Sequence, residues 1–91
     1  MYYVYVPTTK GELRDAILHA GRFRDDAPNP WEEGEAQAAF SGIMQSLIKR
    51  YGRNGKLTMQ FQEALLTRES ECSNNFVWQL NEIVDEIGKL P

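Results

Sequence analysis

Residues 73–90, SNNFVWQLNEIVDEIGKL, carry the most regular hydrophobic pattern of the chain. Apolar side chains recur there every three or four residues, which is the spacing of one face of an α-helix, and Val77 and Val84 flank that face. The face itself consists of Phe76, Leu80, Ile83, Ile87 and Leu90. Ser73 is a good N-cap, because its hydroxyl accepts hydrogen bonds from free backbone N–H groups. The pattern predicts an amphipathic helix packed on a hydrophobic core.

A longer helix is expected from Pro30 to the residue before Gly52. Asn29 suits the N-cap, and Pro30 suits the first helical position because its fixed φ matches the helix. Glu32 and Glu33 favour the positive end of the helix dipole. One apolar stripe then follows the helix, made of Ala36, Phe40, Ile43, Met44, Leu47 and Tyr51.

Two shorter helices complete the helical pattern. Thr9 and Glu12 match a capping box, so the spacing predicts a helix over residues 10–20. Residues 57–62 are ambiguous, because they alternate as in a strand but also continue a helical repeat. The residues that follow them are good helix formers, which favours a helix over 58–69.

The first residues favour an extended conformation. Tyr2 to Val6 is rich in aromatic and β-branched residues and ends at Pro7, as in a short β-strand. We therefore expect a mainly α, four-helix single domain over residues 1–91, with a short N-terminal β-strand or extended arm. The alternative is an α+β fold in which residues 2–6 pair with residues 57–62 in a two-stranded sheet.

Composition excludes several classes of protein. The 91 residues are 42% apolar and carry a net charge of −3, so neither a disordered chain nor a strongly basic nucleic-acid-binding domain is expected. A single cysteine rules out an intramolecular disulfide. No stretch is long and apolar enough for a membrane span, and the first residues lack the basic start of a signal peptide. We therefore expect a cytoplasmic protein with no membrane partner.

Side chains for catalysis or metal binding are scarce. His19 is the only histidine and Cys72 the only cysteine, and the two fall in different predicted elements. Zinc needs about four nitrogen, sulfur or oxygen ligands, which the histidine and cysteine of this chain do not supply. A glycine-rich phosphate loop is also lacking. The sequence therefore predicts no enzyme, no metal and no cofactor.

Aromatic and acidic residues are the strongest candidates for a protein interface. Trp31 lies among carboxylates, and Trp78 lies opposite the apolar face of its helix. Tryptophan is enriched at binding hot spots, and charge complementarity orients a partner. The complete set of interface candidates is Trp31, Trp78, Tyr3, Tyr5, Asp25, Asp26, Glu32, Glu33 and Glu35. The alternative is that Trp31 covers the core and that Trp78 lies flat over its charged neighbours.

A stripe of small residues runs along the long helix, on the side away from its apolar stripe. Gly34, Ala38, Gly42 and Ser46 recur every four residues, so another helix can approach closely there. Two partners fit this pattern: a helix of the same chain, or the same helix of a second copy in a homodimer. Packing within the chain is the simpler explanation.

A basic turn is the only feature that points to nucleic acid. Lys49, Arg50, Arg53 and Lys56 gather near the end of the long helix, where they are candidates for phosphate contacts. Positive charge at this place also complements the negative end of the helix dipole. The last helix carries more carboxylates than lysines, so we do not expect it to enter a DNA groove.

Together these features predict a non-catalytic binding protein that acts by stoichiometric protein–protein interaction, with a homodimer or higher oligomer as one form. A small regulator or inhibitor of a larger host complex, of the kind that phages and mobile elements encode, fits the size and the missing chemistry. One alternative is a homo-oligomer that binds a nucleotide-like ligand with tyrosines and Arg22, Arg24, Arg50 or Arg53. The other alternative is a nucleic-acid-associated regulator that uses the basic turn of residues 49–56.

Overall fold

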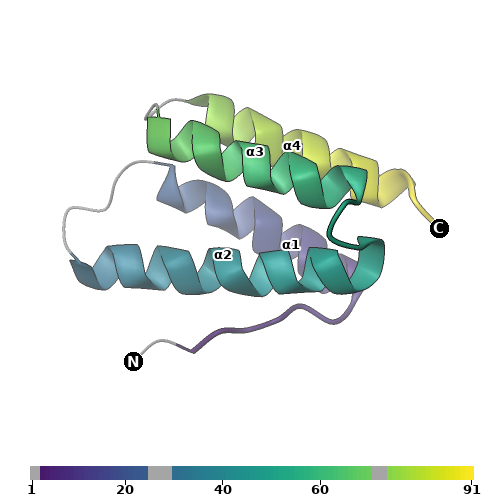
Figure 1. The fold of residues 1–91 in the computed structure, drawn as a ribbon, viewed down its shortest axis with the longest axis horizontal. Coiled ribbons are helices and arrows are strands. Elements are labelled where there is room, and N and C mark those ends of the chain that lie inside the picture. Colours follow the sequence, from purple (N-terminus) through teal and green to yellow (C-terminus); the bar gives the residue numbers. More distant parts are fainter. Residues whose placement is uncertain (1–2, 25–29, 71–73) are drawn as a thin grey trace.

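The helices form an up-and-down bundle in the structure, a computed structural model (Figure 1). It describes residues 3–24, 30–70 and 74–91. Along the chain the elements are α1 (Lys10–Ala20), the short 3₁₀ helix η1 (Gly21–Phe23), α2 (Pro30–Tyr51), α3 (Lys56–Ser70) and α4 (Asn74–Lys89). α1 packs against α2 and α4, and α3 packs against the same two helices, so α2 and α4 lie at diagonal corners. Consecutive helices run in opposite directions.

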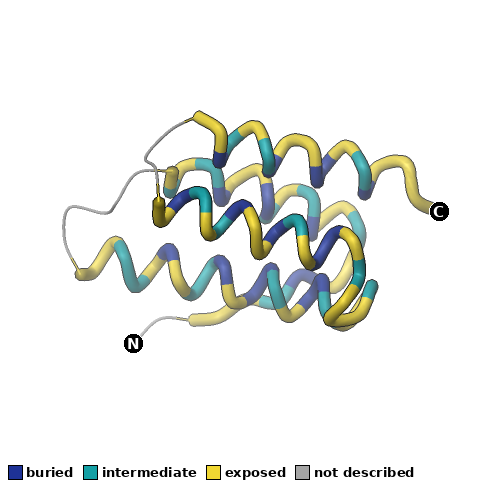
Figure 2. The backbone as a smooth tube through the Cα atoms, turned by 45° about the horizontal axis from the view of Figure 1, so that its top comes forward, coloured by how far each residue is buried: buried dark blue, intermediate teal, exposed yellow. Residues whose placement is uncertain are grey.

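The core is built from one face of each helix (Figure 2). The part of the predicted face that lies in α4 is buried, whereas its last member, Leu90, follows the end of that helix and is 38% exposed. The buried apolar side chains are Leu13, Ile17, Ala20, Ala36, Phe40, Ile43, Leu47, Leu57, Phe61, Ala64, Phe76, Leu80, Ile83, Val84 and Ile87. All four helices therefore share one hydrophobic cluster. None of the helices in the described part of the chain is both long and apolar enough to cross a lipid bilayer.

Phe40 of α2 connects several elements within this core. Its ring meets the rings of Phe23, Phe61 and Phe76 edge to face, with centroids 6.0, 6.4 and 6.1 Å away respectively. Those rings come from η1, α3 and α4, so one side chain joins three other elements. Edge-to-face contacts place a positive ring edge on a negative ring face, which adds to the stabilisation from hydrophobic burial.

Local signals in the sequence account for several helix ends. The Thr9 hydroxyl accepts a hydrogen bond from the Glu12 N–H at 3.1 Å, as a capping box requires. α2 ends before Gly52, whose φ of +87° is a conformation that glycine adopts at little cost. The predicted caps Asn29 and Ser73 lie outside the described residues.

The predicted mainly α fold is confirmed, and the α+β alternative is wrong. Residues 57–62 belong to α3. A strand would place Leu57, Met59 and Phe61 on one face, but Met59 is 49% exposed while the other two are buried. Helical spacing explains that difference, because it separates Met59 from its neighbours by about 160–200°. The described residues contain no β-strand, and the N-terminal segment is an extended arm.

The arm, residues 3–8, lies along α2 and runs in the same direction (Figure 1). The Ser46 hydroxyl donates a hydrogen bond to the Pro7 carbonyl at 2.8 Å. A Cβ atom at Gly42 would come within 1.9 Å of the Tyr5 carbonyl oxygen, so this approach requires glycine. Two residues of an extended chain span about 7 Å and four residues of a helix span about 6 Å. The step from Tyr5 to Pro7 along the arm therefore matches the step from Gly42 to Ser46 along α2.

Candidate functional site

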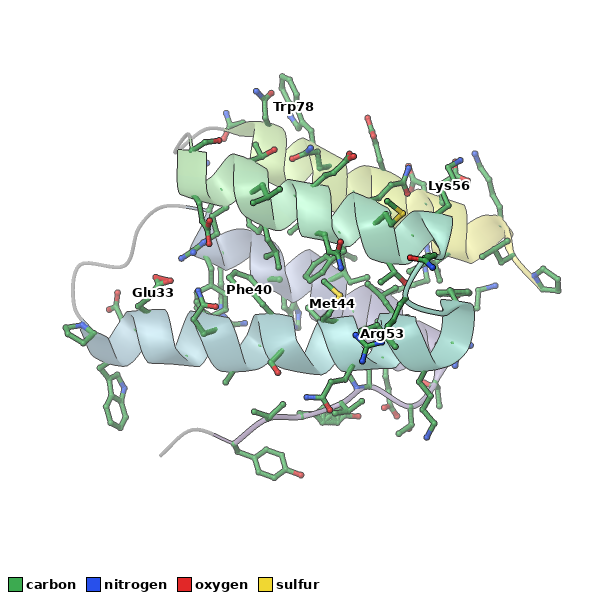
Figure 3. The ribbon with its side chains drawn as sticks, in the orientation of Figure 1. Glu33, Phe40, Met44, Arg53, Lys56 and Trp78 are labelled. Atoms are coloured by element: carbon green, nitrogen blue, oxygen red, sulfur yellow. The ribbon has the colours of Figure 1, made fainter. Side chains whose placement is uncertain are left out.

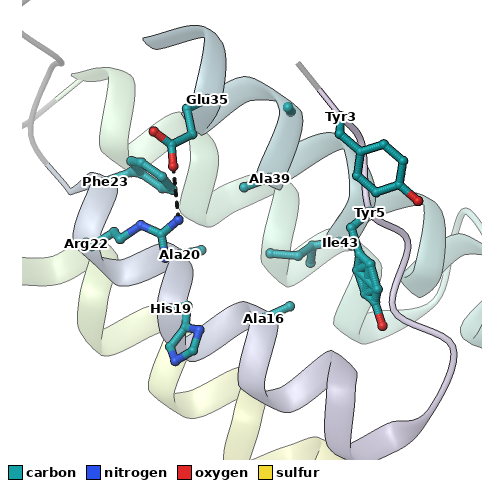
Figure 4. Close-up of a pocket in the computed structure, with 11 residues that line it drawn as sticks. Tyr3, Tyr5, Ala16, His19, Ala20, Arg22, Phe23, Glu35, Ala39 and Ile43 are labelled. Atoms are coloured by element: carbon teal, nitrogen blue, oxygen red, sulfur yellow. Dashed lines mark hydrogen bonds and ion pairs between the residues drawn. The ribbon is translucent and has the colours of Figure 1, made fainter. Parts of the chain in front are cut away.

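A groove of about 410 Å³ opens between the arm, α1 and α2 (Figure 4). Its rim carries the exposed side chains of Tyr3, Tyr5, His19, Arg22 and Glu35. Its floor is small and apolar, made of Ala16, Ala20, Ala38, Ala39 and Ile43. The packing of the arm on α2 therefore forms the groove, because it holds two tyrosines beside the alanines of α1 and α2.

Tyr3 and Tyr5 form the aromatic wall of the groove. Alternate residues of an extended chain point to the same side, so both side chains project from one side of the arm. Tyr3 is 87% exposed and Tyr5 is 48% exposed. Each ring offers a large apolar surface with a polar tip, which is the kind of side chain that protein interfaces favour.

Tyr5 also joins the arm to α1. Its hydroxyl donates a hydrogen bond to the Glu12 carboxylate, which lies 3.4 Å from the Thr8 N–H. The hydrogen bond from Tyr5 is the main cause that lowers the pKa of Glu12, and the one from Thr8 adds to it. The same hydrogen bond to Glu12 raises the pKa of Tyr5. The predicted capping box is therefore formed only in part, because the Glu12 carboxylate bonds to the arm and not to the Thr9 N–H.

This hydrogen bond predicts that arm docking depends on pH. The folded-state pKa of Glu12 is lowered. Its contribution to the stability of the docked arm is therefore present above the pKa that Glu12 has in the unfolded chain, and it is lost as the pH falls through the folded-state pKa. Because the pKa of Tyr5 is raised, its contribution is present below the unfolded value and is lost as the pH rises through the folded value. We expect the strongest docking between about pH 5 and pH 9.

The arm signals in an NMR pH titration measure this effect. The Val4 methyl resonances should shift toward their unfolded positions at both ends of the pH range. Tyr5→Phe is the matched control, because it removes the hydroxyl and keeps the ring, and it should abolish the change at high pH. An unchanged high-pH profile in Tyr5→Phe would show that the hydrogen bond does not hold the arm.

Arg22 and Glu35 close one end of the groove. Their side chains approach to 3.4 Å and are 56% and 52% exposed, so the ion pair contributes little to stability. The Arg22 guanidinium also lies 4.5 Å from the centre of the Phe23 ring. The close-up shows the pair beside the alanine floor (Figure 4). A charged group on a partner can therefore compete for either side chain at low cost.

Trp31 and Trp78 are both exposed, at 68% and 63%. Trp31 lies one turn before Glu35 on α2, so it continues the face of that helix beyond the charged end of the groove. Trp78 projects from α4, the helix diagonal to α2 (Figure 3). The two tryptophans therefore start from the same end of the bundle, but they belong to helices that are not neighbours.

The predicted acidic candidates do not form one surface. Asp25 and Asp26 lie outside the described residues. Glu32 and Glu35 are exposed. Glu33 instead pairs with Arg68 of α3 at 2.9 Å, so this carboxylate holds the bundle together. Of the acidic candidates that the structure describes, Glu35 is the one that lines the groove.

The basic turn lies at the other end of α2 and is separate from the groove. The side chains of Lys49, Arg50, Arg53 and Lys56 are all exposed. Arg50 donates a hydrogen bond to the Thr8 carbonyl at 3.4 Å, which places it on the arm side of α2. Lys56 lines a second, smaller groove of about 240 Å³ between the ends of α2, α3 and α4.

At Gly42 and Ser46, the small-residue stripe of α2 is covered by the arm and not by another helix. Gly42 and Ser46 contact the backbone at Tyr5 and Pro7, and Ala38 lies in the floor of the groove. This part of the stripe therefore packs within the chain, but against an extended segment. A helix-to-helix homodimer through the same stripe would require the arm to dissociate from α2.

The two candidates for a nucleophile and its base are not both described. His19 of α1 is exposed at the rim of the groove, whereas Cys72 lies outside the described residues. Within residues 3–24, 30–70 and 74–91, no three His, Cys, Asp or Glu side chains are grouped so that they could hold a metal ion.

Arg68 of α3 is a residue that sequence analysis missed. It is 3% exposed, and its guanidinium donates to the Glu33 carboxylate at 3.1 and 2.9 Å. Its Nε donates to the Phe23 carbonyl, and the guanidinium lies 5.1 Å from the centre of the Phe40 ring. A signal was present, because Arg68 comes four residues after Ala64 on the buried stripe of α3.

Searches of protein-family models, curated proteins and solved structures find no match to this chain.

Proposed function

We propose that this protein acts by stoichiometric binding to another protein, and that the groove between the arm, α1 and α2 is its docking surface. The observation that carries the proposal is the combination, in one place, of an exposed aromatic wall, an alanine floor and a charged end. Protein interfaces combine a partly apolar centre rich in aromatic side chains with a polar rim. The groove has both components.

The groove fits a partner segment that presents one or two aliphatic side chains. The short side chains of Ala38 and Ala39 leave room for them, and the rings of Tyr3 and Tyr5 supply contact area. Beyond the charged end, Trp31 adds an exposed anchor on the same face of α2. At that end, a charged group on the partner can form an ion pair with Arg22 or Glu35 in place of their own, and such a contact orients the complex.

Binding of this kind suits a small regulator or inhibitor of a larger complex. Such a protein contributes surface instead of reactivity, so its activity is the occupation of a site on its partner. The exposure of both tryptophans supports this role.

Blocking the groove should abolish capture of the partner. Ala39→Arg fills the floor with a long charged side chain, and Trp31→Ala removes the anchor. Each is expected to lower the amount of captured partner about tenfold or more, the effect of losing a hot spot. Quantitative mass spectrometry after affinity capture from the native cell measures this loss, with circular dichroism to verify the fold.

Met59→Ala is the matched control, because Met59 is 49% exposed but lies on α3. It should capture the same proteins in the same amounts as the unchanged chain. Equal capture by Ala39→Arg, Trp31→Ala and Met59→Ala would show that the groove is not the docking surface.

A small anionic ligand is the second candidate, and one observation favours it. Arg22 lines the same groove as Tyr3 and Tyr5, so a guanidinium and two rings are available to a nucleotide-like molecule. The volume also falls within the range of about 300–1,000 Å³ that is usual for ligand pockets. A thermal shift with nucleotides that Arg22→Ala removes, together with capture that Ala39→Arg leaves unchanged, would favour this candidate over protein binding.

A further inference from the structure

The arm has one edge against α2 and one edge free. The carbonyls of Tyr5 and Pro7 face α2. In an extended chain the N–H and C=O groups of successive residues point to opposite edges, so those of Val4 and Val6 face away from α2. Neither backbone makes a hydrogen bond to any residue that the structure describes. Such an edge is a template for pairing with another strand.

The sequence of the arm is complementary to itself. Tyr3-Val4-Tyr5 reads the same in both directions. In an antiparallel pair centred on Val4, the two Val4 residues exchange both backbone hydrogen bonds, and each Tyr3 lies opposite a Tyr5. Aromatic and β-branched residues favour strands, and aromatic cross-strand pairs stabilise them. Tyr3, Val4 and Tyr5 are 87%, 39% and 48% exposed, so pairing would cover apolar surface that now faces water.

The charges of α2 agree with the antiparallel orientation. The arm runs with α2, and its Tyr5 lies over Gly42, so Val4 is beside the middle of that helix. Turning a second copy end for end about Val4 brings the exposed Glu32 of one α2 toward the exposed Lys49 of the other. A parallel pairing would bring like charges together. Complementary charge therefore favours two copies in the antiparallel arrangement.

We propose that two copies of this chain associate through their arms, as an antiparallel two-stranded ribbon centred on Val4. The occupant of the free edge is a second copy, and the two-fold axis passes between the two Val4 residues. This pairing shares the rings of Tyr3 and Tyr5 with the proposed docking groove. It differs in its hydrogen bonds, which come from the free backbone edge of the arm. The assembly would carry two grooves.

Sedimentation of the full chain tests the ribbon. The unchanged protein should sediment as a dimer that dissociates on dilution. Val4→Pro removes the N–H at the centre of the ribbon and should raise the dissociation constant about tenfold or more. Val4→Thr is the matched control, because it keeps the N–H and the β-branched shape, and its dimer should persist. A chain that stays monomeric at all concentrations, or a dimer that Val4→Pro leaves intact, overturns the proposal.

Disulfide trapping gives a second measurement that does not depend on the proline variant. In the ribbon the two residues at position 4 have Cα atoms about 5.5 Å apart, within the range that a disulfide bridges. Val4→Cys in a Cys72→Ser background should therefore give a covalent dimer under mild oxidation. Met59→Cys in the same background should not. Equal cross-linking of the two variants overturns the proposal, and the capture experiment on the groove would keep its own outcome.

Discussion

Replacing Arg68 with alanine should lower the free energy of unfolding by about 3 kcal/mol, a large share of the stability of a small domain. Arg68 is buried and bonds to α2 through Glu33 and to η1 through the Phe23 carbonyl. Breaking a buried ion pair by removing one partner costs about 3–5 kcal/mol. The Glu33 side chain is 37% exposed and is partly hydrated, so we expect the lower end of that range.

Urea unfolding followed by circular dichroism measures this loss. Arg53→Ala is the matched control, because Arg53 is exposed between α2 and α3, and it should change stability by less than about 0.5 kcal/mol. Arg68→Met keeps an apolar stem over the Phe40 ring and should recover about 1 kcal/mol relative to alanine. A loss below about 1 kcal/mol in Arg68→Ala would mean that the ion pair does not hold these elements together.

Replacing Phe40 with alanine should cost about 4–5 kcal/mol, the upper end of the range for phenylalanine in protein cores. The ring is 3% exposed and meets three other phenylalanine rings edge to face. Those rings come from separate elements, and the Arg68 guanidinium covers another part of the same ring. The cavity would therefore be lined by groups that cannot all move in to fill it.

Phe40→Leu provides the graded comparison, because it keeps most of the volume and should cost about 1.5 kcal/mol. Leu66→Ala is the surface control, since Leu66 is 63% exposed on α3. Combining Phe40→Leu with Arg68→Ala should deviate from additivity by about 0.5–1 kcal/mol, because the two side chains are in contact. Equal losses for the alanine and leucine variants would contradict the central role of this ring.

The helices were predictable because their signals are local. The Thr9 cap and the apolar repeat of α4 each depend on residues within a few turns, and the bounds expected for the first helix, 10–20, are those of α1. The helix-or-strand ambiguity at residues 57–62 arose because short apolar runs fit both periods. The exposure of Met59 resolves it, but exposure depends on the packing of α3 against its neighbours.

The groove was not predictable because its parts are far apart in the sequence. Helix geometry alone was enough to put Trp78 on the polar side of α4, where it is exposed. The small-residue stripe predicted that another backbone approaches α2 closely at Gly42. The pattern does not distinguish an approaching helix from an extended segment. Arg68 lies on the buried stripe of α3, yet its partner Glu33 is 35 residues away. Folding alone brings Arg68 to Glu33, and Gly42 to the backbone of Tyr5.

The close contact between Gly42 and the arm also limits which substitutions this sequence can accept during evolution. Any side chain larger than hydrogen there would clash with the Tyr5 carbonyl oxygen, so a natural variant with a bulkier residue must place residues 3–8 differently. Substitutions at position 42 and within the arm should accordingly be inherited as linked changes. In any relative of this chain, glycine at position 42 would therefore indicate that the arm and its two tyrosines keep this place on α2.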